Sequence, residues 1–252
     1  MLPTTILLIQ FRNSTVTARL EQQSIERELG TAVGIVCLSV LDDSIIWNKP
    51  SQMMTPIDGV ILGGSGDYDF DGGRLPDDGA RVTAYGLLEK LRPLLDYLFR
   101  HDVPTLGICF GHQVIGAYAG ATVVHDIAQK KMRSHAVSVI VDTESYPICT
   151  NVPNTFYAHY GHKDCLDRVP EGATLLMSGG AACKVSALCY KQNIFTTQFH
   201  PELTIHDVHL RAEATPGYLP VGVQVTEAFI EDNYSSQILK NFSTLVQSFK
   251  RE

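Results

Sequence analysis

The stretch GICFGHQ, residues 107–113, guides the interpretation of the whole chain, and its Cys109 directly follows an apolar run from Val103 to Ile108. A nucleophilic side chain between two glycines at a strand-to-helix junction is typical of a nucleophile elbow, a turn too crowded for side chains at the flanking positions. Cys109 would then project above the edge of the sheet. It would also lie at the N-terminus of the next helix, whose partial positive charge favours the reactive thiolate. The alternative is an ordinary buried cysteine in a strand-loop-helix connection.

A second group of candidate residues lies about ninety residues downstream, in TQFHPE, residues 197–202. A thiol nucleophile needs a base within hydrogen-bond reach, and the base needs a third group that fixes its orientation. His200 and Glu202 suit these roles because they follow a β-like run and are separated only by a proline. On its own, a His-Pro-Glu sequence is more typical of a surface turn. Together with the elbow, it predicts a site formed by Cys109, His200 and Glu202.

These residues resemble the class I glutamine amidotransferases, in which a Cys-His-Glu triad occupies an elbow and a distal His-Pro-Glu sequence. The resemblance runs from about Thr5 to His200 and is strongest to the amidotransferase domain of GMP synthase and its free-standing relatives. GHKDCLDRVP, residues 161–170, is similar to the Ser-His-x-Asp-x-Val-x-x-Leu-Pro pattern of that group, although position 161 is Gly where the group usually has Ser. LGGS, residues 62–65, resembles the glycine-rich turn that supplies an oxyanion-hole amide.

The resemblance implies a catalytic role for three positions. Cys109 would be the nucleophile, His200 the general base and acid, and Glu202 the group that orients the imidazole. The thiol would attack the γ-amide of glutamine, the imidazole would protonate the departing ammonia, and water would release glutamate from the thioester.

The resemblance also implies an oxyanion hole and a substrate pocket. Backbone N–H groups of Gly64 and Phe110 would hold the tetrahedral oxyanion, and losing one such donor costs roughly 3 to 4 kcal/mol. Gln113, His162 and Asp164 would line the pocket for the γ-glutamyl substrate. His162 could instead be a satisfied core histidine.

Composition limits the function classes. A length of 252 residues, with 44% hydrophobic and 19% charged residues, suits a single α/β domain over residues 1–252, which the resemblance implies is a glutamine amidotransferase (glutaminase) domain. A formal charge of −7 without a long basic run argues against nucleic-acid binding. The six cysteines contain no Cys-x-x-Cys pair, which favours a reducing, cytoplasmic setting over a disulfide framework. We expect neither a signal peptide nor an apolar run long enough for a membrane.

Strand-like and helical runs alternate through the first part of the chain and predict an open, mostly parallel twisted sheet with helices on both faces. Active sites of such sheets lie at the carboxyl ends of the strands, where Cys109 is placed. The resemblance implies the flavodoxin-like amidotransferase fold. Shorter β-like pieces after the elbow helix predict a small additional β region. The expected elements are strands near 6–11, 34–40, 59–62 and 105–108, helices near 16–29, 80–99 and 235–249, and β pieces near 136–141, 155–158, 174–177, 187–190 and 193–198.

Two segments, Ser65–Gly79 and Leu203–Asn233, are longer than the family pattern and would flank Cys109. We interpret them as a lid or a partner surface, the alternative being plain surface excursions. The acidic residues of the first segment begin like a calcium loop, but Arg74 and Pro76 interrupt the pattern. We therefore expect no metal and no cofactor.

The sequence predicts hydrolysis of the glutamine γ-amide through a Cys109 thioester, with ammonia delivered to an acceptor on a separate synthetase subunit. A second reading is a self-sufficient γ-glutamyl hydrolase or peptidase that acts on a small γ-glutamyl compound. A third is a catalytically silent binding module that keeps the fold. The intact Cys-His-Glu set argues against the third reading.

Overall fold

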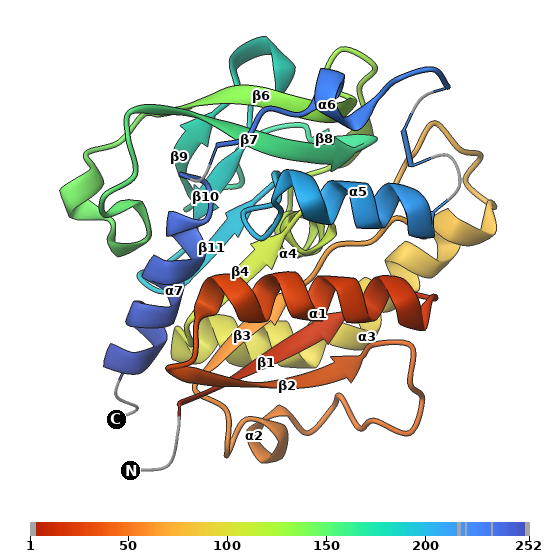
Figure 1. Cartoon of the computed structure of the whole chain (residues 1–252). Coiled ribbons are helices and arrows are strands. Elements are labelled where there is room, and N and C mark those ends of the chain that lie inside the picture. Colours follow the sequence, from red (N-terminus) through yellow and green to blue (C-terminus); the bar gives the residue numbers. More distant parts are fainter. Residues whose placement is uncertain (1–3, 216–217, 220, 233, 250–252) are drawn as a thin grey trace.

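The computed structural model describes residues 4–215, 218–219, 221–232 and 234–249 (Figure 1). Its centre is an open nine-stranded sheet with the strand order β2-β1-β3-β4-β11-β10-β9-β6-β7. The first five strands in that order are parallel. They are β2 (Val33–Ser39), β1 (Thr4–Gln10), β3 (Gly59–Leu62), β4 (Thr105–Ile108) and β11 (Ile194–Thr197).

Helices cover both faces of the parallel half, because alternate side chains of its strands point to opposite sides. Leu7 and Ile9 of β1 pack in a core with the leucines of α3 (Gly79–His101) and with α4 (Phe110–Tyr118). Ile6 and Leu8 pack in a second core with α1 (Thr15–Leu29) and α7 (Gln237–Ser248). The expected α/β architecture is therefore confirmed.

Four antiparallel strands extend the same sheet beyond β11. They are β10 (Ala187–Cys189), β9 (Thr174–Ser178), β6 (Lys131–Val139) and β7 (Thr155–His162). A small additional β region is present, but it is a separate antiparallel pair that the sequence did not single out, β5 (Val123–His125) and β8 (Asp164–Leu166). The later β pieces therefore continue the main sheet, which is mixed as a whole and parallel around the site.

Three short helices and three 3₁₀ turns complete the described elements. The helices are α2 (Pro50–Met53), α5 (Ile205–Ala214) and α6 (Val225–Ala228), and the 3₁₀ turns are Thr143–Ser145, Pro147–Cys149 and Gly180–Ala182. Helix α5 lies against α1 on the front face of the sheet in Figure 1. Within the described ranges, no helix is both long and apolar enough to cross a membrane.

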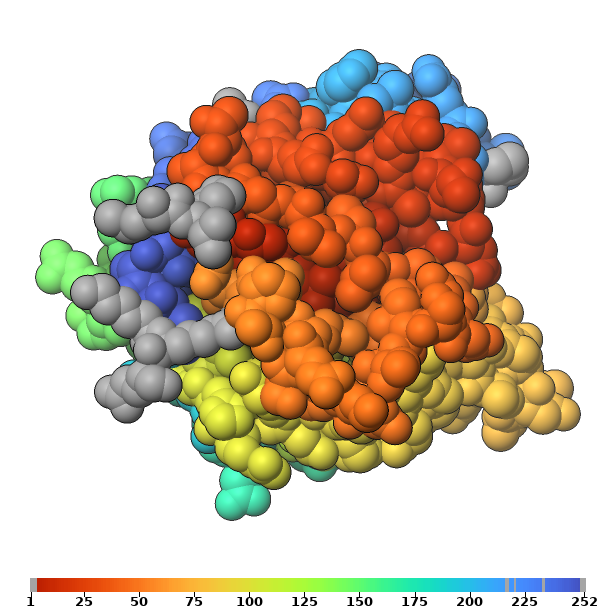
Figure 2. Space-filling view, turned by 90° about the horizontal axis from the view of Figure 1, so that it is seen from below, coloured from red at the N-terminus to blue at the C-terminus, as the bar shows by residue number. Residues whose placement is uncertain are grey.

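The two long segments have different structures. Residues 65–78 form an irregular loop at the carboxyl end of β3, with Leu75 strongly exposed. Figure 2 shows the part of the chain near residue 75 projecting from the edge of the molecule. The second segment contains α5 and α6, and its residues 216, 217, 220 and 233 lie outside the described residues.

Candidate active site

Cys109 occupies a sharp turn between β4 and α4. Its backbone has φ 53° and ψ −98°, a region that side-chain-bearing residues rarely adopt. The flanking glycines permit this turn, because a Cβ on Gly111 would lie 2.2 Å from the carbonyl oxygen of Leu62, and one on Gly107 would lie 2.7 Å from that of Gly111. The Cys109 amide donates to the Thr197 carbonyl at 2.8 Å, which ties the turn to β11. The residue is thus held at the carboxyl ends of two neighbouring parallel strands.

His200 and Glu202 follow β11 on the same edge of the sheet. The imidazole Nδ1 of His200 lies 2.7 Å from Oε1 of Glu202, and both side chains are buried. The backbone amide of His200 donates to the His159 carbonyl at 2.9 Å, so β7 fixes the position of the ring. Because Nδ1 of His200 contacts Glu202, the other ring nitrogen, Nε2, faces the opposite side of the ring and can contact a group there.

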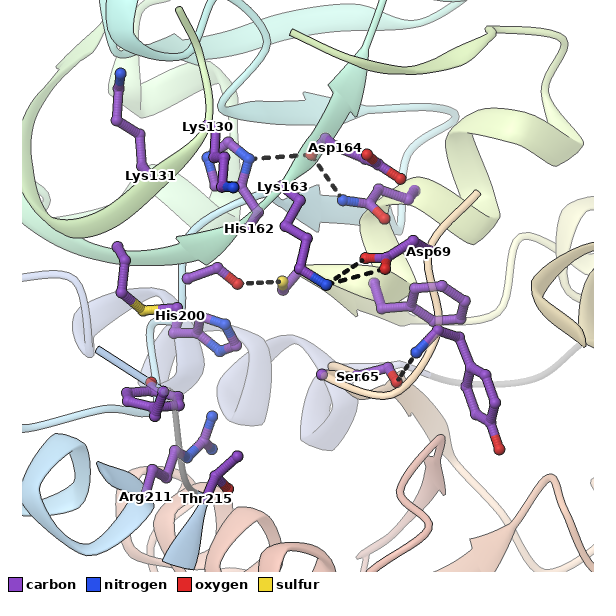
Figure 3. Close-up of a pocket in the computed structure, with 18 of the residues that line it drawn as sticks. Ser65, Asp69, Lys130, Lys131, His162, Lys163, Asp164, His200, Arg211 and Thr215 are labelled. Carbon is purple, nitrogen blue, oxygen red and sulfur yellow. Dashed lines mark hydrogen bonds and ion pairs between the residues drawn. The ribbon is translucent and has the colours of Figure 1, made fainter. Parts of the chain in front are cut away.

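The side chains of Cys109 and His200 come together beside Gly64. A Cβ built on Gly64 would lie 3.2 Å from Cε1 of His200 and 3.7 Å from Cβ of Cys109. The thiol is 3.7 Å from the Gly161 carbonyl, its hydrogen-bond acceptor in this structure. Figure 3 shows His200 at one side of the cavity. A side chain at position 64 would crowd the His200 ring and the Arg12 guanidinium, whose Nη2 would lie 3.0 Å from its Cβ.

Electrostatic interactions favour an ion pair between the His200 imidazolium and the Glu202 carboxylate. Burial disfavours the imidazolium of His200, but the negative charges of Glu202 and Cys109 outweigh it and raise the pKa of His200 to about 9. Burial also disfavours the carboxylate of Glu202, yet the charge and hydrogen bond of His200, with the charge of Arg211, lower the pKa of Glu202 to about 2. At neutral pH the imidazole of His200 can therefore remain protonated beside Glu202 and Cys109.

A buried network of charged and polar groups underlies the turn after β3. Glu21 of α1 is 1% exposed and accepts from Nε and Nη2 of Arg12 at 3.2 and 2.8 Å. Nε2 of Gln10 donates to the same carboxylate at 3.2 Å. The amide of Gly64 also donates to Oε1 of Glu21, at 2.9 Å. In contrast, the amide of Phe110 has no hydrogen-bond acceptor among the described residues.

Sequence reasoning missed Arg12, Glu21 and Arg211. Arg211 lies on α5, is buried, and donates from Nη2 to Oε1 of Glu202 at 3.1 Å. A charged residue directly after a buried strand was the available signal for Arg12. No local pattern distinguishes Glu21 or Arg211 from the other charged residues of their helices.

A cavity of about 690 Å³ opens above Cys109 and His200 (Figure 3). Gln113 and His162 face it, and both contact the backbone carbonyl of Asp164, Gln113 from Nε2 at 2.9 Å and His162 from Nδ1 at 3.0 Å. Burial lowers the pKa of His162 to about 4, so this imidazole is neutral at physiological pH. The predicted pocket residues therefore lie together around one cavity.

The carboxylate of Asp164 is engaged by the long loop. It accepts from the backbone amides of Asp71 and Gly72 at 2.8 and 2.7 Å. Lys163 reaches across to Asp69 at 3.0 Å (Figure 3), and Asp69 also pairs with Arg74 at 2.8 Å. The pattern GHKDC thus anchors the segment that begins at Ser65. Three acidic residues of this loop form ion pairs: Asp69 with Lys163 and Arg74, Asp71 with Arg81, and Asp78 with Arg74.

Among the described residues, no cluster of three or more His, Cys, Asp or Glu side chains has the spacing of a metal site. His206 and His209, close in sequence to His200, belong to α5. The groups at or beside the cavity include the thiol of Cys109, the imidazole of His200, the carboxylate of Glu202 and backbone amides. These groups are the ones needed for acyl transfer.

Comparison with known proteins places the chain among the glutamine amidotransferases. The family model of the class-I glutamine amidotransferases matches residues 16–210. One subunit of the glutamine-hydrolysing GMP synthase from Methanocaldococcus jannaschii is 33% identical over 118 residues, which cover 46% of this chain and 60% of that protein. The corresponding subunit from Thermoplasma acidophilum is 30% identical over 166 residues, 65% of this chain and 72% of that protein.

The fold has solved counterparts as well. A glutamine amidotransferase from Thermotoga maritima superposes with a TM-score of 0.67 at 17% sequence identity, covering 99% of this chain and 100% of that one. This likeness concerns the fold alone. The chain spans only 60% of the length of the GMP synthase subunit from Methanocaldococcus jannaschii that it matches.

Proposed function

The chain belongs to the class-I glutamine amidotransferase family, and on that premise we propose that it is a glutaminase domain that splits the γ-amide of glutamine through a Cys109 thioester. The ammonia released would serve an acceptor on a partner synthetase. The observation that carries the proposal is the arrangement of His200 between Glu202, 2.7 Å from its Nδ1, and the thiol beside Gly64.

In this mechanism the Cys109 thiolate attacks the γ-carbonyl carbon of glutamine. The C–S bond forms as the carbonyl electron pair moves to oxygen, which gives a tetrahedral oxyanion. The His200 imidazolium then gives its proton to the amide nitrogen, and the C–N bond breaks to release ammonia. A water molecule, deprotonated by His200, attacks the thioester and releases glutamate. The raised pKa of His200 supports this role, because the proton is present when the leaving group needs it.

The remaining site residues support binding and orientation. Glu202 would fix the tautomer and position of His200, as the third member of a triad does. The free amide of Phe110 would donate to the oxyanion, and Gly64 would supply the second amide. Gln113 and His162 would line the γ-glutamyl pocket, and Asp164 would hold the loop that closes it.

The proposal of a partner synthetase rests on the relatives. The GMP synthase proteins from Methanocaldococcus jannaschii and Thermoplasma acidophilum are each described as one subunit of a glutamine-hydrolysing enzyme. The segments 65–79 and 203–233, which contribute Tyr68 and Tyr218 to the cavity lining, would form the lid or the partner surface. The six cysteines are all free, which supports a reducing cytoplasmic setting.

A second candidate function is a γ-glutamyl hydrolase or peptidase, and the size of the cavity favours it. A volume of about 690 Å³ falls in the range of roughly 300 to 1,000 Å³ that suits drug-sized ligands, well above the needs of one amino acid. A γ-glutamyl compound with a leaving group larger than ammonia would fill this space.

Steady-state kinetics of the purified protein tests the proposal and separates the two functions. An ammonia-delivering subunit should hydrolyse glutamine slowly alone and faster with its synthetase, and Cys109→Ala should abolish both rates. Cys165→Ala, which alters another buried cysteine, is the matched control and should retain activity. Negligible glutamine turnover with kcat/KM of about 10⁴ M⁻¹s⁻¹ or more on a γ-glutamyl peptide would establish the hydrolase instead.

A further inference from the structure

The cavity above Cys109 is lined mainly by cations, in a chain that is acidic overall. The formal charge of the chain is −7, yet among the described residues that line the cavity six are Lys or Arg and two are Asp. Three of these cations are paired with carboxylates, Arg12 with Glu21, Arg211 with Glu202 and Lys163 with Asp69. The three others, for which the described residues supply no ion-pair partner, are Lys130, Lys131 and Arg133. The cavity therefore favours an anionic occupant.

Free glutamine does not account for this surplus of positive charge. At neutral pH it carries one α-carboxylate and one α-ammonium group, so its net charge is zero. A γ-glutamyl amide whose amine is itself an amino acid carries a second carboxylate and is a net anion. Charge therefore distinguishes such a compound from glutamine, and the cavity of about 690 Å³ has room for its additional atoms.

A space for the second half of such a compound lies over Gly161. The Gly161 carbonyl accepts from the Cys109 thiol at 3.7 Å, so this residue borders the reacting sulfur. A Cβ on Gly161 would lie 3.5 Å from Sδ of Met132 and 3.8 Å from Oη of Tyr218, and all three residues line the cavity. The pattern that residues 161–170 resemble usually has Ser at this position. Glycine leaves the space between Met132 and Tyr218 open to the cavity.

Tyr218 belongs to the end of the cavity that a leaving group would occupy. Its amide donates to the Thr215 carbonyl at 3.0 Å, which keeps Tyr218 beside the end of α5. Figure 3 shows Thr215 at one end of the cavity and Asp164 at the other, with His200 between them. The γ-glutamyl pocket is proposed beside Asp164, and His200 would give its proton to the departing amine. The leaving group would therefore point toward Tyr218.

The hydroxyl of Tyr218 is a hydrogen-bond donor in a fixed place. Burial raises the pKa of Tyr218, although the charges of Arg211 and Arg12 act in the opposite direction. A neutral phenol can donate to a carboxylate, and such a bond is charge-assisted. The ring packs against the small apolar cluster of Leu203, Val208, Val225, Ala228 and Phe229.

We propose that the space over Gly161, between Met132 and Tyr218, is a leaving-group subsite, and that its occupant is an amino acid or short peptide joined through its amine to the γ-carboxyl group of glutamate. The inference rests on the proposed thioester chemistry at Cys109 and names a substrate class for the second candidate function. The Tyr218 hydroxyl donates to the carboxylate of the leaving group, and the unpaired cations at the cavity favour its charge.

The reaction at this subsite balances in the same way as that of glutamine. The bond between the Cys109 sulfur and the γ-carbon forms, the C–N bond breaks, and the departing amine takes its proton from His200. Water then cleaves the thioester, so the products are glutamate and the free amino acid or peptide.

The first test is calorimetric titration of Cys109→Ala, which should hold the substrate without turnover. The ligands are γ-glutamylglycine and γ-glutamylethylamide, which is similar in size but lacks the second carboxylate. We expect γ-glutamylglycine to bind roughly tenfold more tightly, because a hydrogen bond to a charged group contributes on that scale. The difference should shrink as salt is added. Equal dissociation constants for the two amides would overturn the inference.

The second test measures the ratio of kcat/KM for γ-glutamylglycine to kcat/KM for glutamine. Gly161→Ser narrows the subsite and Tyr218→Phe removes the donor, so each should lower this ratio roughly tenfold. A Cβ at position 161 meets only ordinary van der Waals contacts, so the serine variant should fold. A ratio that neither substitution changes would contradict the subsite.

A matched pair of lysine variants tests the contribution of charge to the same ratio. Lys130→Gln removes one of the unpaired cations of the cavity and should lower the ratio several-fold. Lys240→Gln, which alters an exposed lysine of α7, is the control and should leave it unchanged. Equal ratios for these two variants would show that the positive charge at the cavity does not select the leaving group.

Failure of the inference and failure of the proposed function give different results. A wild type that hydrolyses glutamine through Cys109 but leaves γ-glutamylglycine intact overturns the subsite and keeps the proposed function. A wild type that hydrolyses neither compound, while Cys109→Ala still binds γ-glutamylglycine more tightly than γ-glutamylethylamide, overturns the chemistry at Cys109 and supports the subsite as a binding site.

Discussion

One oxygen of Glu202 serves two partners. Oε1 accepts from His200 at 2.7 Å and from Arg211 at 3.1 Å, while the buried Oε2 has no hydrogen-bond partner in the described part of the chain. This arrangement fixes the carboxylate from two sides and thereby fixes the imidazole. We therefore propose that Glu202 orients the imidazole, whereas His200 would carry the proton itself.

The first prediction at the residue scale follows from this division of roles. His200→Ala should lower kcat for glutamine by about 10⁴-fold or more, close to the effect of removing Cys109, because members of a triad act as a unit. Glu202→Gln should be at least about tenfold less damaging, because the imidazole stays in place. Steady-state assays measure both, with Glu171→Gln, an exposed glutamate, as the control. Wild-type rates for His200→Ala would identify another base.

The second prediction concerns stability as a function of pH. The pKa of His200 is raised from 6.5 to about 9, so its contribution to stability is fully present below pH 6.5 and is lost as pH rises through about 9. The pKa of Glu202 is lowered from 4.5 to about 2, so its contribution is fully present above pH 4.5 and is lost as pH falls through about 2. Both contributions are complete between pH 4.5 and 6.5.

Urea denaturation measures this effect. The free energy of unfolding of the wild type, minus that of a His200→Ala/Glu202→Gln double variant, should be largest between those two pH values and should decline on either side. A difference that is flat from pH 3 to pH 9.5 would show that the two side chains are not charged partners in the folded protein.

Local pattern explains which site residues the sequence could predict. Cys109, His200 and Glu202 each lie in a short stretch whose spacing carries chemical meaning. Glu21 and Arg211 lie in helices of ordinary composition, and their importance arises only when α1 and α5 pack beside the strand ends. Whether the Gly64 amide faces Cys109 or Glu21 depends on a single peptide plane, which no sequence pattern specifies.

At the scale of elements, α5 connects the long second segment to the candidate site. Its first turn is fixed by a capping box, in which Thr204 Oγ1 accepts from the Asp207 amide and the Asp207 carboxylate accepts from the Thr204 amide. Asp207 also pairs with Arg27 of α1 at 2.7 Å. Arg211 follows one turn later on the same helix, so the cap determines where the guanidinium meets Glu202.

The third prediction tests this connection. Thr204→Ala removes the cap and should cost about 1 kcal/mol of stability, together with a several-fold loss of kcat because Arg211 is less well positioned against Glu202. Thr204→Ser keeps the oxygen and should retain both properties. Thermal denaturation and glutaminase assays provide the measurements, and a loss of stability with unchanged kcat would show that α5 has no part in the chemistry.

The predicted elements agree with the structure where periodic hydrophobic patterns are strong. The helices expected near 16–29, 80–99 and 235–249 are α1, α3 and α7, and the four parallel strands expected before the elbow are present. Helices α5 and α6 were not predicted, because only a few of their residues are buried, in a small separate cluster around Val208 and Phe229. The pairing of β6 with both β7 and β9 depends on tertiary packing.

At the scale of the whole molecule, the cavity is bounded by parts of the chain that are far apart in sequence. It lies at the carboxyl ends of β3, β4 and β11, with the loop after Ser65 on one side and α5 with the residues that follow it on the other. A parallel sheet supplies such a site by topology alone. Residues of both long segments, 65–79 and 203–233, line this cavity.

The measurement that tests the account most directly is mass spectrometry of the protein quenched with acid during turnover of isotope-labelled glutamine. We predict one γ-glutamyl group bound as a thioester on the peptide that contains Cys109, accumulating further in His200→Ala if that variant still acylates, and absent from Cys109→Ala. A γ-glutamyl group on a different cysteine, or release of ammonia by Cys109→Ala at the wild-type rate, would contradict the central claim.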